Sequence, residues 1–148
     1  MMLTYIHLFQ YGEYEGCYQD SFNQRLFQGD MVKFKTDNSP EVCIQHCLET
    51  GYQFAGLQYG LVSSLYLVMG QFEAETLPQE CFCGNTLPAD KKKKISSDSC
   101  NMECPGDSAQ SCGGYLTMDI FGTGITFPTL SELCPFHYQG LFLSSLQR

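Results

Sequence analysis

The chain has 148 residues, a formal charge of -8 and a pI of about 4.6. An acidic chain of this length indicates one domain and lacks the positive charge on which nucleic-acid binding depends, so we expect no nucleic-acid partner. Nine residues are cysteines, well above ordinary usage. This composition favours a small disulfide-linked domain that folds in an oxidising compartment.

The N-terminal flank, residues 1–14, does not match a secretory signal. Its first letters, "MMLTYIHLFQ", lack a basic n-region and a small-residue cleavage site. No window of the chain reaches the roughly 18 to 20 apolar residues of a membrane-spanning helix. Because the cysteines indicate export, we expect a fragment whose signal or membrane anchor lies outside this chain.

Short alternating apolar stretches, bounded by turn-forming residues, predict several strands. The expected extended segments are residues 16–18, 25–27, 52–58, 80–84 and 115–121. Residues 85–98 are expected to form a loop. The run Lys91–Lys94 is interpreted as the solvated tip of that loop, with a binding patch as the alternative.

One helix is predicted over residues 40–49. The sequence Asn38-Ser39-Pro40-Glu41 supplies a capping residue, a proline in the first turn and an early acidic residue. The helix is expected to end at Thr50-Gly51, where glycine can adopt the left-handed conformation.

Eight of the nine cysteines lie between Cys17 and Cys112, and Cys134 is alone in an irregular tail, residues 123–148. A structural zinc site is the alternative to disulfides, because two Cys-x3-Cys pairs could supply four thiolates. Those pairs are Cys43–Cys47 and Cys100–Cys104. Zinc would leave the other four cysteines of this segment without a role, so we expect disulfides and no metal.

Two cysteine spacings match each other. Cys43 and Cys47 lie on one face of the predicted helix, about 6 Å apart along its axis. Cys81 and Cys83 lie on one face of a strand, about 6.7 Å apart. A helix packed on that strand could therefore form two parallel disulfides, although eight cysteines allow 105 pairings and spacing alone leaves them open.

Six blocks of the sequence resemble, in order, those of the WSC domain family: "GCY", "SPEVCIQHC", "FAGLQYG", "ECFCGN", "CNMECPGDSAQSCGG" and "YLTMDIF". The resemblance covers residues 15–122. It implies an α+β fold related to PAN and apple domains, with one helix packed on a short antiparallel sheet. It also implies the disulfides Cys17–Cys100, Cys43–Cys81, Cys47–Cys83 and Cys104–Cys112.

In WSC domains the strand like "GLQYG" runs almost directly into "ECFCG", whereas here residues 61–79 intervene. An inserted surface loop is one explanation, because long loops add little closure entropy. The apolar letters "LVSSLYLV" are unlike a surface loop and favour a translated intron instead.

Catalysis by this chain is not expected. A nucleophilic site needs a free nucleophile beside a base, and the paired cysteines are consumed in disulfides. His46 lies between two helix cysteines, and the other histidines, His7 and His137, lie in the flanks. No glycine-rich phosphate loop is present, and we expect no cofactor.

The resemblance implies a binding domain that acts outside the cell or in the secretory lumen, with a glycan or glycoprotein partner. Aromatic faces would stack on sugar rings and amides would supply hydrogen bonds. The candidate binding residues are Tyr18, Gln58, Tyr59, Phe82, Asn85 and Tyr115. Phe82 and Tyr115 are expected to be core residues if the domain buries most of its aromatics, and Tyr59 is expected at the surface rim.

The motifs "CGGYLTM" and "FGTGI" are similar in sequence to the WSC domain of animal peptide O-xylosyltransferases. This implies an alternative interpretation, in which the chain is a fragment of a Golgi enzyme that initiates proteoglycan glycosaminoglycans. The catalytic glycosyltransferase domain would then lie outside the chain.

Overall fold

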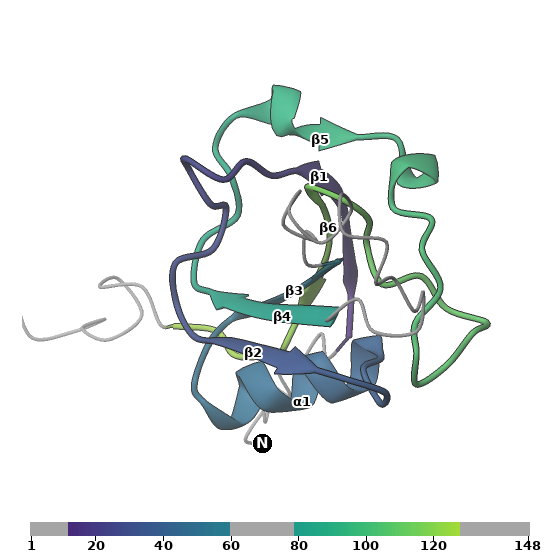
Figure 1. The fold of residues 1–148 in the computed structure, drawn as a ribbon. Coiled ribbons are helices and arrows are strands. Elements are labelled where there is room, and N and C mark those ends of the chain that lie inside the picture. Colours follow the sequence, from purple (N-terminus) through teal and green to yellow (C-terminus); the bar gives the residue numbers. More distant parts are fainter. Residues whose placement is uncertain (1–11, 60–78, 128–148) are drawn as a thin grey trace, which may run out of the picture.

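The structure of the protein is a computed structural model that describes residues 12–59 and 79–127. In this part of the chain, six strands form one sheet in the order β2-β4-β3-β6-β1-β5, and all neighbours are antiparallel. The strands are β1 (Tyr14–Gln19), β2 (Met31–Phe34), β3 (Phe54–Tyr59), β4 (Gln79–Gly84), β5 (Lys94–Ile95) and β6 (Thr117–Gly122). The α-helix α1 (Pro40–Glu49) packs against β3 and β4 (Figure 1). The predicted small disulfide-rich α+β fold is confirmed.

The helix forms where its capping residues predict it. The Ser39 hydroxyl accepts a hydrogen bond from the Val42 N–H at 3.3 Å, and Pro40 occupies the first turn, where a missing N–H costs nothing. At the other end, Gly51 has a φ of 86° and Thr50 caps the last turn. The predicted bounds of the helix, 40–49, are confirmed.

Side chains alternate between two cores, one on each face of the sheet. On β4, Cys81 and Cys83 belong to the core beneath the helix, whereas Phe82 belongs to the opposite core. We call these faces the helix face and the aromatic face. The buried residues of the aromatic face are Tyr18, Phe27, Phe82, Met118 and Ile120.

Four disulfides link the chain, with the pairing that the family resemblance implies. Two of them join α1 to β4 as parallel rungs, because the i, i+4 spacing on the helix matches the i, i+2 spacing on the strand. The pairs are Cys17–Cys100, Cys43–Cys81, Cys47–Cys83 and Cys104–Cys112.

The extended segment predicted at residues 25–27 is wrong. The Asp20 carboxylate accepts hydrogen bonds from the Leu26 N–H at 2.9 Å and from the Arg25 guanidinium at 2.8 Å. This segment therefore bonds to a side chain instead of to a neighbouring strand, and it inserts Phe27 into the aromatic face. The second strand begins only at Met31.

The loop predicted at residues 85–98 contains short regular elements. The 3-10 helix η1 (Lys91–Lys93) precedes β5, and a second 3-10 helix, η2 (Ser97–Ser99), follows it. Strand β5 pairs with β1 at the edge of the sheet, with Ile95 opposite Cys17.

Most of the predicted insertion, residues 61–79, lies outside the described residues. Its last residue, Gln79, is the first residue of β4 and pairs with Tyr59 and Phe34. The predicted flanks also lie largely outside the described part. Among the described helices, none is long and apolar enough to cross a membrane.

Candidate functional site

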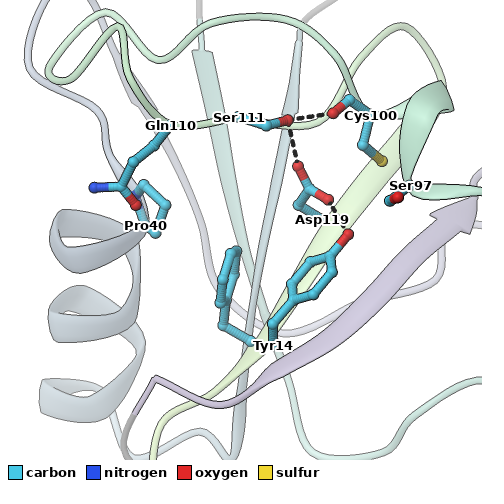
Figure 2. A pocket seen from close by; sticks show the side chains of 8 residues that line it. Tyr14, Pro40, Ser97, Cys100, Gln110, Ser111 and Asp119 are labelled. Atoms are coloured by element: carbon cyan, nitrogen blue, oxygen red, sulfur yellow. Dashed lines mark hydrogen bonds between the residues drawn. The ribbon is translucent and has the colours of Figure 1, made fainter.

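A pocket of about 310 Å³ opens on the helix face, between the start of α1 and η2 (Figure 2). Its floor comes from β6, one wall from β1 and the roof from the segment 100–114. The residues that line it are Tyr14, Pro40, Ser97, Cys100, Gln110, Ser111, Asp119 and Phe121. We call it the Asp119 pocket.

Asp119 lies at the floor of the pocket and is only 2% exposed. Its Oδ1 accepts from the Tyr14 hydroxyl at 2.7 Å, and its Oδ2 accepts from the Ser111 hydroxyl and the Gly113 N–H, each at 2.8 Å. Burial raises the pKa of this carboxyl, and the three donors oppose that rise. The carboxyl group is thus fixed in orientation by three donors, one from β1 and two from the segment 100–114.

The segment 100–114 holds the donors in place without a hydrophobic core of its own. Cys17–Cys100 ties its start to β1, and Cys104–Cys112 closes its tip. Gly113 has a φ of 74°, and a Cβ at this position would collide with the Leu57 carbonyl oxygen. Only glycine can therefore bring this N–H to the Asp119 carboxylate.

Two aromatic rings form the lower wall of the pocket. Tyr14 and Phe121 face each other across β1 and β6, with ring centroids 5.1 Å apart and planes tilted by 47°. Tyr14 is 45% exposed, and its hydroxyl points to Asp119 in Figure 2. Burial and the adjacent Asp119 raise the pKa of Tyr14, so its hydroxyl stays protonated and donates.

Acidic groups hold the opposite rim. The Gln110 amide Nε2 donates to Glu41 at 3.0 Å and to Asp107 at 2.8 Å. The pKa of Glu41 is lowered by a hydrogen bond from its own backbone and then by Gln110. None of the eight residues that line the pocket is a lysine, arginine or histidine.

Three of the sequence-predicted binding residues have side chains in the interior, on the aromatic face. Phe82 is 6% exposed and lies under the Arg25 guanidinium, 5.3 Å from its carbon. The fully buried Gln58 amide lies 2.8 Å from both Arg25 and Asp20, in an orientation that satisfies both. Tyr18 is 6% exposed, below the Lys94 ammonium.

The other three candidates reach the surface at two separate places. Tyr59 and Tyr115 lie together, with ring centroids 6.4 Å apart, and the Tyr59 hydroxyl donates to the Glu103 carbonyl. Tyr115 is 49% exposed, so its interpretation as a core residue is wrong. Asn85 follows the other end of β4, where it caps the Gln53 N–H at 3.1 Å.

Sequence analysis missed Tyr14 and Asp119. The available signal was the final strand, "YLTMDIF", in which Asp119 alternates with Met118 and Ile120 and therefore faces the helix side. An acidic residue at an inward position of a buried strand indicates a fixed polar partner. Tyr14 fell in the flank that was expected to be irregular.

The clusters of metal-ligating residue types in the described part all involve disulfide cysteines. One contains Cys43, Cys47 and Cys81, and the other contains Cys17, Cys100 and Asp119. Cysteines bind metal as thiolates, which a disulfide does not provide.

A profile of the WSC domain matches residues 14–62 and 71–114, and the intervening residues 63–70 lie inside the predicted insertion. "Xylosyltransferase oxt" from Drosophila pseudoobscura pseudoobscura is 39% identical over 110 residues, which are 74% of this chain and 10% of that protein. Its Drosophila melanogaster counterpart is 38% identical over 110 residues, with the same coverage. Mouse "Kremen protein 1" is 30% identical over 128 residues, which are 85% of this chain and 21% of Kremen.

The chain therefore spans about a tenth of the length of the xylosyltransferases that it matches. The family match includes all four disulfide pairs, the helix α1 and the strands β1 to β5. This chain belongs to the WSC domain family.

Proposed function

We propose that this chain is a non-catalytic sugar-binding domain that works outside the cell or in the lumen of the secretory pathway. The observation that carries the proposal is the Asp119 pocket. It combines two aromatic rings with a fixed carboxylate, hydroxyl groups and an amide. A sugar ring has an apolar C–H face for the aromatic wall and hydroxyls for the polar floor.

The chemistry of the pocket supports binding over catalysis. The serine hydroxyl beside its carboxylate is that of Ser111, which contacts Asp119 and the Cys100 carbonyl. The described histidine, His46, bonds to Asp30 at 2.8 Å and lines a different surface. Among the described residues, the pocket therefore has no imidazole to activate the Ser111 hydroxyl.

The four disulfides support the proposed compartment, because such pairs persist in oxidising surroundings. The parent protein is proposed to be membrane-anchored. The alternative proposal is that the chain is a fragment of a Golgi peptide O-xylosyltransferase, for which the similarity to the two Drosophila proteins is the support. Genomic sequence downstream of this chain tests it: a glycosyltransferase domain would support the alternative, and a transmembrane segment with a short tail would contradict it.

The test of sugar binding is a glycan array probed with the full chain, made in an oxidising host with its four disulfides verified by non-reducing peptide mapping. We expect binding of one glycan class at micromolar to millimolar concentrations. The disulfide-reduced chain is the control and should lose that binding. A correctly folded chain that binds no glycan at millimolar concentrations would contradict the proposal.

The pair of the partly buried Tyr59 and the exposed Tyr115 is a second proposed contact surface, which the sequence already indicated. It offers aromatic faces beside the buried amide of Gln79, the strand partner of Tyr59, but it has no buried carboxylate fixed by three donors as Asp119 is. If this pair holds the sugar, Tyr59→Ala should abolish the array signal while the four disulfides stay intact.

A further inference from the structure

We infer that the Asp119 pocket selects sugars without negative charge and rejects uronic acids and sulfated sugars. This inference rests on the proposed sugar-binding function and names the ligand class. It comes from the balance of hydrogen-bond donors and acceptors and from the charges around the pocket.

The floor of the pocket has more acceptors than donors. The Ser111 hydroxyl has one proton but lies within hydrogen-bond distance of two acceptors, the Asp119 Oδ2 and the Cys100 carbonyl oxygen. One of those two acceptors must therefore lack this proton at any moment. A hydroxyl group of a ligand can donate to it, whereas a ligand carboxylate or sulfate has no proton to give.

The rim of the pocket also offers a ligand acceptors and no free donor from Gln110. Both bonds of the Gln110 amide nitrogen go to the carboxylates of Glu41 and Asp107. In Figure 2 this nitrogen points away from Asp119. The group that Gln110 leaves for a ligand is its carbonyl oxygen, which is another acceptor.

The charges around the pocket have one sign. Asp119 lies at the floor, and Glu41 and Asp107 lie behind the rim, while none of the eight described residues of the lining is basic. A ligand anion would lose its water without gaining an opposite charge, which is unfavourable. A neutral polyol loses only hydroxyl hydration, which the acceptors of the floor can replace.

The basic run Lys91–Lys94 lies on η1 and β5 and does not line the pocket. Anionic glycans could associate with those lysines through charge alone, so a test of total binding would mix two surfaces. The test must therefore report on the pocket itself.

We would titrate the full 15N-labelled chain with methyl β-glucoside and, separately, with methyl β-glucuronide, which differs by oxidation at C6. The readout is the amide signals of Gly113 and Tyr14. We expect saturable shifts with the glucoside and at least tenfold weaker binding of the glucuronide. Equal or tighter binding of the glucuronide at these two signals would overturn the inference.

Ser97→Arg sharpens the test, because it places a cation on the exposed rim of the pocket. It should reduce the preference for the glucoside to threefold or less. Ser99→Arg adds the same charge at an exposed residue outside the lining and should keep the tenfold preference. If Ser97→Arg leaves the preference unchanged, the charge argument is wrong.

The failures of the inference and of the proposed function are distinguishable. If glycans bind on the array but neither monosaccharide shifts Gly113 or Tyr14, the sugar site lies elsewhere and this inference fails alone. If the array also shows no binding, the proposed function fails with it.

Discussion

The two faces of the sheet are stabilised by different means. The core of the helix face contains six disulfide cysteines, whereas the core of the aromatic face contains none and consists of rings, Met118 and Ile120. Cross-links restrict the unfolded chain, and apolar packing stabilises the folded one. The Asp119 pocket lies on the cross-linked face, where loops with little apolar surface can still be held in one geometry.

The position of the pocket follows from the size of the helix. The ten residues of α1 lie mainly over β3 and β4 and contact β6 only in part, so much of the helix face of β1 and β6 lies beyond the helix. The segment 100–114 covers that area, held by Cys17–Cys100 and Cys104–Cys112. Because this cover is irregular and polar, a cavity with Asp119 at its floor remains.

The largest effect should come from the disulfide of longest span. In the chain-entropy model, replacing Cys17 and Cys100 by alanine removes about 4.6 kcal/mol of unfolding free energy, because the linked residues are 83 positions apart. Replacing Cys104 and Cys112, which are 8 positions apart, should remove about 2.6 kcal/mol. Urea denaturation of the two double variants measures both values. A larger loss for the Cys104–Cys112 loop would mean that native contacts, and not chain entropy, dominate on this face.

On the aromatic face, Phe27→Ala should remove about 3 to 4 kcal/mol of unfolding free energy, since the residue is 3% exposed. Its ring lies against Gly84 and Gly56, where added Cβ atoms would collide with it or with Met118. Phe22→Ala is the matched control, because Phe22 is 56% exposed and should change stability by less than about 0.5 kcal/mol. Similar losses from both variants would contradict the assignment of this core.

The sequence predicts those features of the two faces that arise from residues close together in the chain. The helix and the paired cysteine spacings are local patterns, and both match the structure. The Asp119 pocket requires that Tyr14, Ser111 and Asp119 meet across 105 positions of sequence, and only the order of the strands brings them together. The error at residues 25–27 has the same origin, because the Asp20 carboxylate competes with strand pairing there.

The titration of Asp119 should make the unfolding free energy of the protein depend on pH. Its pKa is raised above the ordinary value of 3.8, so the folded state binds the proton more tightly than the unfolded state. Its contribution to stability is therefore full below about pH 3.8 and is lost as pH rises through the folded pKa. We expect the difference in unfolding free energy between the wild type and Asp119→Asn to fall over this range.

The control for this titration is the pair Glu41→Gln and Asp107→Asn. Their pKa values are lowered, so their contributions should instead be lost as pH falls. Urea denaturation from pH 3 to 7 gives all three profiles. A wild-type minus Asp119→Asn difference that rises with pH would show that the donors outweigh burial at this carboxyl.

The central claim, that the sugar binds in the Asp119 pocket and not at the second aromatic pair, is tested most directly by two alanine variants of exposed tyrosines. Tyr14→Ala removes a pocket wall and a donor to Asp119, while Tyr115→Ala removes an equally exposed ring elsewhere. Calorimetric titration with the glycan found on the array should show a loss of about fivefold or more in affinity for Tyr14→Ala, since a stacked ring contributes about 1 kcal/mol. Tyr115→Ala should stay within twofold of the wild type. The reverse order would contradict the account and assign the sugar to Tyr59 and Tyr115.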